Sequence, residues 1–175
     1  MTSFALTDEH EQLRATVAEF ARDVVAPAIG GFYERGEFPY DIVTRMGKLG
    51  LFGLPFPEQY GGMGGDLVAL CLALHELARV DSSVAITLEA GVALGAMPVY
   101  RFGSAEQQAR WLPELCLGER LAAASRPARR KISGRDVLRV GSRIAVIDHS
   151  RSGSETESLG SRGRLRRITT TGWLR

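Results

Sequence analysis

Several groups of residues in this chain have types and spacings that could support chemistry, and the first is a glycine-rich stretch. The sequence YGGMGGD (residues 60–66) resembles loops that bind phosphate through backbone amides. It lacks the Gly-Lys-Ser/Thr end of such loops, so no lysine or hydroxyl is placed for phosphate and magnesium. The next helix is expected to start at Asp66, whose carboxylate would repel an anion there. We therefore interpret the stretch as a sharp turn between packed helices.

Metal binding is the second chemistry to consider. The three histidines, His10, His75 and His149, are scattered along the chain, and none is spaced from a cysteine or carboxylate as metal ligands are. The two cysteines, Cys71 and Cys116, form no CxxC pair. Both lie in apolar helical segments, so we expect buried, reduced thiols and no metal site.

Acid–base and nucleophilic catalysis are the third kind of chemistry to consider. Glu76 and Glu89 lie within apolar runs, and a catalytic role for either stays open. Solvent-facing or salt-bridged helix positions are the commoner outcome for such carboxylates. The spacing of Ser, His and Asp residues supports no nucleophilic triad. No residue is therefore assigned a catalytic role.

Five helical segments are expected to position these residues. In the first, residues 7–29, apolar residues recur at helical spacing behind a capping Thr7, and Pro27 should end or bend the helix. The other four are residues 38–50, 66–80, 82–103 and 104–119. We expect Pro98 and Pro113 to interrupt the last two, and residues 66–80 to be the most buried helix. Residues 1–125 are thus predicted to form an all-α helical bundle.

The composition changes abruptly near residue 126. Residues 1–125 hold 9 Lys and Arg against 16 Asp and Glu, a net charge of −7, whereas residues 126–175 hold 13 against 4, a net charge of +9. Every Phe and Tyr precedes residue 126, so the second part has little apolar surface to offset its ordering entropy. Apart from a strand-like run at residues 143–148, we expect a mostly irregular basic tail.

Composition and sequence pattern also limit the kinds of partner that we expect for the chain. The basic tail could contact nucleic-acid phosphates, but it has no Phe or Tyr for base stacking, so nucleic acid is not the expected partner. No run of 18 apolar residues is present, and the N-terminus lacks the basic and apolar parts of a secretion signal. The expectation is a cytoplasmic protein without a membrane span.

The order and spacing of several motifs resemble the N-terminal helical domain of the acyl-CoA dehydrogenases, over about residues 4–124. The matching stretches are YGG-x-G from Tyr60, E-L-A-R-x-D-x-S at residues 76–83, M-P-x-x-x-F-G at residues 97–103, the capped E-Q-Q helix, and L-P-x-L-x-x-G-E at residues 112–119. Each motif is weak alone, and together they are specific.

The resemblance implies a fold, a reaction and a cofactor. Members of this family are flavoenzymes of fatty acid metabolism that oxidise acyl-CoA thioesters to trans-2-enoyl-CoA. A glutamate removes the α proton while the β hydrogen leaves as hydride to the N5 atom of FAD. The FAD is held largely by a middle β-domain and a C-terminal helical domain. The resemblance also implies an acyl-CoA substrate. A helical domain without the other two would expose the apolar faces that pack against them, so we also expect a homo-oligomer.

The helical domain of the family contributes part of the acyl-chain pocket. Carried over by position, Thr87, Ala90, Gly91 and Leu94 would line it, and these four residues are called the acyl wall below. Small residues there leave room for an acyl chain. They equally permit close packing of helices, and the sequence leaves both interpretations open.

The resemblance ends near residue 125. There the family continues into a strand and a T-E-P-x-x-G-S-D loop that contacts flavin and substrate, whereas this chain reads ASRPARRKISGRD. The catalytic glutamate has no counterpart and most of the FAD site is missing. We therefore expect a truncated, catalytically incomplete homologue, and we hypothesise a frameshift near codon 125. The alternative is a non-catalytic helical binding module whose basic tail docks on an acidic surface.

Overall fold

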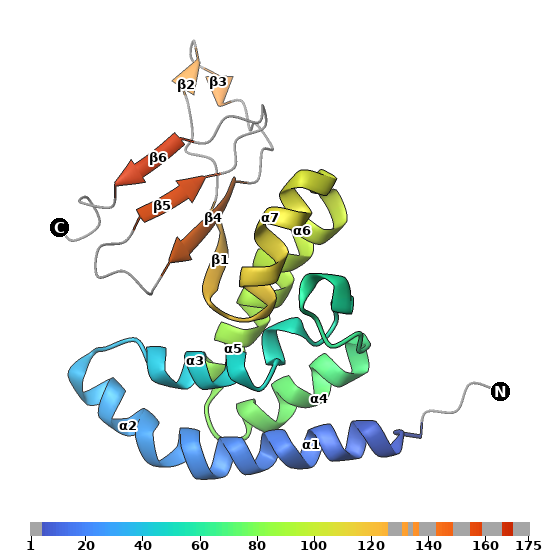
Figure 1. The fold of residues 1–175 in the computed structure, drawn as a ribbon. Helices are drawn as coiled ribbons and strands as arrows, with labels where there is room; N and C mark the ends of the chain where they lie inside the picture. The colour runs from blue at the N-terminus through green and yellow to red at the C-terminus, as the bar shows by residue number, and fades with distance from the viewer. Residues whose placement is uncertain are drawn as a thin grey trace.

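The computed structural model describes residues 5–125 and the strand residues 131–132, 135–136, 143–148, 155–158 and 166–169, with side chains described up to Leu121. Figure 1 shows a body of helices with a small sheet beside the upper end of the bundle. The helical elements are α1 (Asp8–Phe20), η1 (Ala21–Val25), α2 (Ala26–Arg35), α3 (Tyr40–Lys48), η2 (Leu51–Gly53), η3 (Glu58–Tyr60), α4 (Leu67–Ala78), α5 (Ser82–Glu89), η4 (Ala90–Ala96), α6 (Met97–Phe102) and α7 (Ala105–Cys116). The predicted helical bundle is confirmed.

Local capping signals begin three of these helices as predicted. Thr7 Oγ1 accepts a hydrogen bond from the amide of His10, and Asp66 Oδ1 accepts one from Ala69. Ser104 and Gln107 form a reciprocal capping box, in which each side chain bonds to the backbone amide of the other residue. These contacts satisfy amides that have no partner inside their helix.

The three prolines expected to interrupt helices do not end them. Pro27 follows the π-helical segment η1, and Pro98 follows the π-helical segment η4. A proline removes one amide from the helical ladder and crowds the carbonyl four residues earlier, and a wider π turn accommodates both effects. Pro113 lies inside α7, which continues to Cys116. Packing of the buried residues around it, Trp111, Leu112 and Leu115, outweighs the local cost.

The helices α1, η1 and α2 form one continuous run over Asp8–Arg35, and a second, shorter run joins α5, η4 and α6. By length and composition alone, Ser82–Phe102 is a helix of 21 residues that is apolar enough to cross a membrane, although the sequence prediction found no such span. In this structure 44% of its apolar window is buried. It packs against α4, α7 and β1, which is also the environment of a core helix. The run therefore forms the centre of the bundle.

The core lies where these helices meet the glycine-rich loop. Its largest fully buried side chains are Phe52, Phe56, Ile42, Met46, Leu51, Leu77, Leu88, Leu112, Val17, Val25, Val43 and Val84. The helix α4 contributes Leu77 but exposes Leu67, Val68 and Cys71. The prediction that Cys71 would be a buried thiol is therefore wrong. The prediction that this helix would be the most buried is not contradicted, since α4 buries Ala69, Leu70, Ala73, Glu76 and Leu77. An apolar sequence on all faces does not fix which face meets the core.

A sheet begins at the end of the helical part. Its strands β1 (Arg120–Ser125), β4 (Arg143–Asp148), β5 (Glu155–Ser158) and β6 (Arg166–Thr169) lie in that order and are antiparallel, and β2 (Lys131–Ile132) pairs with β3 (Arg135–Asp136). The predicted strand at residues 143–148 is confirmed. The sheet starts inside the predicted helical unit of residues 1–125, because Gly118 adopts φ +67° and turns the chain out of α7. Within the predicted irregular tail, the sequence did not indicate β2, β3, β5 and β6, which are short strands fixed by pairing with their neighbours. The remaining residues of the predicted tail lie outside those described.

Candidate functional site

The glycine-rich turn is closed by its own hydrogen bonds. Each amide from Gly61 to Gly65 donates to a carbonyl of residues 53–58, at distances from 2.8 to 3.2 Å. None of these five amides is left to bind a phosphate, which requires several converging backbone donors. The prediction of a sharp turn in place of a phosphate loop is confirmed.

The end of this turn is tied to the start of the chain. Asp66 Oδ1 accepts a hydrogen bond of 2.9 Å from the amide of Ala69 and lies 3.2 Å from His10 Nε2. The pKa of Asp66 is lowered, first by the Ala69 amide and then by the hydrogen bond with His10. His10 therefore links the N-termini of α1 and α4. Among the described residues no group of three or more potential metal ligands is found.

The residues of the acyl wall straddle the boundary between core and surface. Thr87 and Ala90 are half-buried, Gly91 is buried, and the side chain of Leu94 is 49% exposed. The hydroxyl of Thr87 donates a hydrogen bond of 2.8 Å to the carbonyl of Ser83, so it is satisfied within α5. Three of the four residues therefore present accessible surface, and the wall role stays a prediction for them.

At Gly91 the structure shows close packing. A β carbon at Gly91 would lie 2.8 Å from Cε1 of Phe52, closer than such contacts allow. The opposite edge of the same ring faces Gly118, where a β carbon would lie 2.7 Å from Cδ2 of Phe52. The ring of Phe52 is thus held between η4 and the turn from α7 into β1. Of the two interpretations of the small residue at position 91, the packing one applies.

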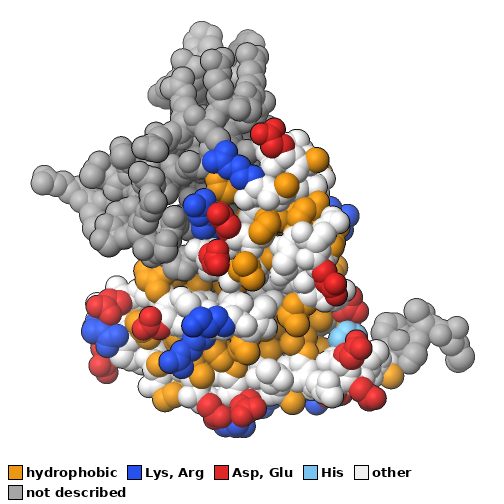
Figure 2. All heavy atoms as spheres, viewed as in Figure 1, with side chains coloured by type: hydrophobic (Ala, Val, Ile, Leu, Met, Phe, Trp, Pro, Cys, Tyr) orange, Lys and Arg blue, Asp and Glu red, His pale blue; other side chains and the backbone are white. Residues whose placement is uncertain are grey.

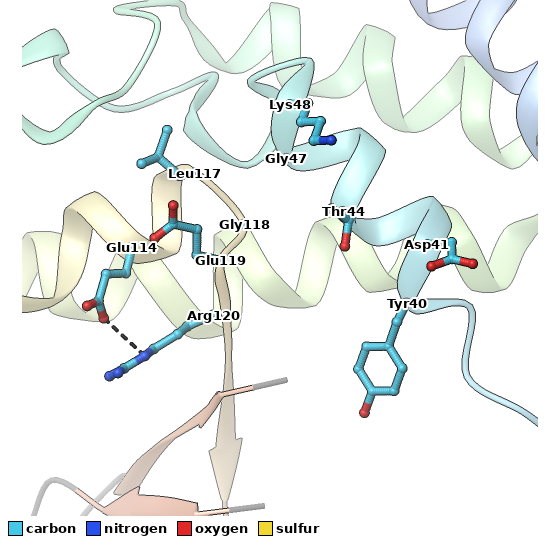
Figure 3. A pocket seen from close by; sticks show the side chains of 10 residues that line it. All are labelled: Tyr40, Asp41, Thr44, Gly47, Lys48, Glu114, Leu117, Gly118, Glu119 and Arg120. Atoms are coloured by element: carbon cyan, nitrogen blue, oxygen red, sulfur yellow. Dashed lines mark ion pairs between the residues drawn. The ribbon is translucent and has the colours of Figure 1, made fainter. Parts of the chain in front are cut away.

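The described part of the chain has a pocket of about 780 Å³ between α3 and the turn from α7 into β1. Figure 3 shows residues of α3 on one side of it and the turn on the other. Its lining residues are Tyr40, Asp41, Thr44, Gly47, Lys48, Glu114, Leu117, Gly118, Glu119 and Arg120. No residue of the acyl wall lines this pocket. Sequence reasoning missed it because its two sides are far apart in the chain.

One wall of the pocket is held by Arg120. Its Nε lies 3.1 Å from Glu114 Oε2, an ion pair drawn as a dashed line in Figure 3. The contact falls outside hydrogen-bond geometry, so this carboxylate oxygen is buried with no hydrogen bond in the described part. The guanidinium also lies 5.7 Å from the ring centre of Trp111, within reach of a cation–π interaction. Arg120 therefore fastens the start of β1 to α7.

Neither the pocket nor the glycine-rich turn fits the diphosphate of FAD. A flavin dinucleotide carries a diphosphate, which needs cationic side chains or free backbone amides. The pocket brings three carboxylates, Asp41, Glu114 and Glu119, against Lys48 and an Arg120 that is already paired. The amides of the glycine-rich turn are also occupied. Neither the pocket nor the glycine-rich turn therefore supplies the donors for the diphosphate.

The buried carboxylate of Glu76 is neutralised within α4. The residue is 5% exposed, and its Oε2 accepts a hydrogen bond of 3.1 Å from Arg79 Nη1. Its other oxygen lies 3.4 Å from His75 Nδ1. The prediction of a salt-bridged position is confirmed. Paired carboxylates of this kind cost less to bury than isolated ones.

Comparisons with known proteins agree with this helical architecture. The profile of the family described as Acyl-CoA dehydrogenase, N-terminal domain matches residues 7–119. An acyl-CoA dehydrogenase of Bacillus subtilis is 40% identical over 118 residues, which are 67% of this chain and 31% of that protein. A short-chain specific acyl-CoA dehydrogenase of Clostridium acetobutylicum is 37% identical over 120 residues, covering 69% of this chain and 32% of that protein.

A solved structure extends the likeness beyond the helices. The butyryl-CoA dehydrogenase of Megasphaera elsdenii superposes with a TM-score of 0.69 and 25% identity, and the match covers 92% of this chain and 50% of that one. The helices of this chain end at Cys116, so a match over 92% of the chain must also include residues of the described strands. The chain spans about a third of the length of the curated relatives named above. On the match to residues 7–119 and on these identities, the chain belongs to the acyl-CoA dehydrogenase family.

Proposed function

We propose that this chain supplies the acyl wall of an FAD-dependent acyl-CoA dehydrogenase, with fatty acyl-CoA thioesters as substrates. The observation that carries the proposal is the family match over residues 7–119, which spans the whole α5–η4 run. The accessible surface of Thr87, Ala90 and Leu94 on that run supports it. An apolar and small-residue surface suits an alkyl chain, whose burial is favourable in proportion to the area removed from water.

The proposal assigns no catalytic step to the described residues. The general base and the FAD site would be supplied by other parts of a complete enzyme, on the same chain or on another. The function of these residues is then to bind and orient the acyl chain and to exclude water from it, which is how binding energy contributes to catalysis. A homo-oligomer, a cytoplasmic location and catalytic incompleteness of this chain belong to the same proposal.

A binding experiment tests the wall. Calorimetric titration of the full chain with butyryl-CoA, and with free CoA as the baseline, should show tighter binding of the thioester. Ala90→Phe should weaken that preference by filling the wall surface. Ala15→Phe on α1, at an exposed alanine outside the acyl wall, is the matched control and should leave the preference unchanged. Equal affinity for CoA and butyryl-CoA would overturn the proposal.

Cofactor binding is a separate test. A purified protein with a flavin absorbance band at about 450 nm would mean that FAD is retained, and it would contradict our inference that neither the pocket nor the glycine-rich turn fits FAD. A colourless protein that becomes flavin-loaded on mixing with a C-terminal fragment of a homologue would support a wall supplied to an enzyme completed elsewhere. The nucleotide sequence across codons 115–180 tests the frameshift. If neither other frame encodes a stretch like T-E-P-x-x-G-S-D, that hypothesis is dropped.

A further inference from the structure

We propose that Phe52 is a positioning residue that sets the distance between the acyl wall and strand β1, and through it the length of acyl chain that the wall favours. The inference rests on the proposed function of the wall. It concerns a residue outside the wall, on η2, which neither the motifs nor the predicted wall residues indicated. Phe52 is 1% exposed, so it acts through its neighbours and touches no ligand.

Two backbone segments close around the ring of Phe52, and a third, at the end of α3, lies against one of them. Gly91 of η4 faces the Cδ1–Cε1 edge, and Gly118 of the turn before β1 faces the Cδ2–Cε2 edge. A β carbon at Gly118 would also lie 3.0 Å from the Cα of Gly47 at the end of α3. Because glycines stand on both sides, the ring sits directly between two backbones. Its width therefore determines how closely η4 and the turn approach each other.

The segment η4 is one whose position packing can set. It is a π-helical run of seven residues, Ala90–Ala96, joined to Pro98 by a single residue. Such π-helical segments are rare and occur mostly as single-turn insertions inside α-helices, frequently at functional sites. Ala90, Gly91 and Leu94 of the wall belong to this segment. A smaller side chain at position 52 would let η4 settle toward the core and would deepen the surface on its outer side.

The packing step has its own test. Gly91→Ala should destabilise the protein, because its new methyl group meets the ring of Phe52. In the Gly91→Ala and Phe52→Leu double variant that loss should shrink, and the free energies should be non-additive by double-mutant cycle in urea denaturation. Gly30→Ala is the matched control, since a β carbon at this helical glycine meets no atom within 4 Å. Additive effects of Gly91→Ala and Phe52→Leu on the free energy of unfolding would contradict the packing of Phe52 against Gly91.

The effect of Phe52 on chain-length preference needs a measurement that a loss of stability alone would not change. We would titrate the full chain with butyryl-CoA and octanoyl-CoA, with free CoA as the baseline. Phe52→Leu should raise the octanoyl-to-butyryl affinity ratio by about threefold or more, within the range that extra methylenes contribute in apolar pockets. Val43 is also fully buried, but it lies on α3. Val43→Ala should therefore lower stability and leave the ratio unchanged.

The outcomes separate the two proposals. A wild-type chain that binds both thioesters more tightly than CoA, with a ratio that no Phe52 variant changes, overturns the role of Phe52 and leaves the proposed function standing. A ratio that changes equally in Val43→Ala also overturns it, because any loosening of the core would then suffice. A wild-type chain with no preference for thioesters over CoA overturns the proposed function, and the chain-length inference falls with it.

Discussion

The hydroxyl of Tyr60 donates a hydrogen bond of 2.9 Å to Oε1 of Gln108, and this contact joins the glycine-rich turn to α7. The amide nitrogen of Gln108 donates in turn to the carbonyl of Tyr100 at 2.8 Å and to that of Gly103 at 3.2 Å. One half-buried glutamine therefore connects the turn, the end of α6 and the start of α7. Of these, α6 and α7 pack against η4, the segment that carries most of the acyl wall.

Replacing this glutamine should cost more than replacing its partner. Gln108→Leu leaves the Tyr60 hydroxyl and two carbonyls without their hydrogen bonds, and we expect a loss of about 1–3 kcal/mol in the free energy of unfolding. Tyr60→Phe removes one bond and should cost about 1 kcal/mol. Urea denaturation measures both. Gln59→Leu, at an exposed position next to Tyr60, is the control, and an equal loss in it would contradict the network.

The cap of α4 should make stability depend on pH. Its carboxylate, Asp66, has a pKa below the ordinary value of 3.8, so the folded state favours the ionised form. The resulting stabilisation is present above that ordinary value and is lost as the pH falls through the lower folded pKa. Asp66→Asn keeps a capping oxygen that does not titrate. Below about pH 4 the wild type should therefore lose more of its free energy of unfolding than Asp66→Asn does.

The contribution of the Asp66 cap to the free energy of unfolding can be measured separately from its dependence on pH. Asp66→Ala should cost about 0.5–2 kcal/mol at neutral pH, the usual range for a lost N-cap. Asp41→Ala, in the first turn of α3 and without a capping bond of its own among the described contacts, provides a comparison. Stability curves in urea at neutral pH and at about pH 3 would decide. A wild-type minus Asp66→Asn difference that is constant across this range would contradict the linkage.

The two thiols should react very differently. Burial raises the pKa of Cys116 to about 12, so it stays a protonated thiol at pH 8 and does not provide the reactive thiolate. Cys71 is exposed on α4. A disulfide reagent that reports released thiolate should therefore modify one cysteine quickly in the folded protein and the second only after denaturation. Cys71→Ser should abolish the fast phase, and a fast phase that persists in this variant would contradict the burial of Cys116.

The helical surface should bind apolar probes. Large apolar side chains are exposed on several helices, and Figure 2 shows hydrophobic side chains gathered across one face between acidic and basic ones. Phe102 is 89% exposed and Leu67 is 62% exposed. Exposed apolar area of this kind favours association. At micromolar concentration we expect an increase in the fluorescence of a hydrophobic dye, oligomers in light scattering, and a reduction of both in Phe102→Ser.

A monomer that binds no dye would contradict this expectation. Lys48→Ser, on the polar side of α3, is the control for Phe102→Ser because it removes a charged side chain and no apolar one. It should leave dye binding unchanged. An equal loss of fluorescence in both variants would mean that the dye reports charge and not apolar surface.

Local signals in the sequence predicted local structure well. The caps at Thr7, Asp66 and Ser104 depend on side chains within three residues of the amides they satisfy, so spacing alone is enough to find them. The strand at residues 143–148 was likewise visible in its β-branched composition. The order of motifs gave the family, because it sums many weak local matches.

What the sequence did not show depends on contacts between distant segments. The clamp of Phe52 between Gly91 and Gly118 and the pocket between α3 and the turn before β1 are of this kind. The exposure of Cys71 also depends on which face of α4 meets α1 and α5. Composition and periodicity do not determine such contacts, since the packing of the whole bundle selects among several apolar faces.

The π-helical segments before Pro27 and Pro98 have a consequence for counting along the chain. A π turn contains about one residue more than an α turn, so each segment rotates every later side chain on its helix by roughly the angle of one residue. A helical wheel drawn straight through Ala21–Val25 or Ala90–Ala96 therefore assigns the later residues to the wrong face. Deleting a single residue within either segment would restore an ordinary α-helix, and substitutions alone would leave the register as it is.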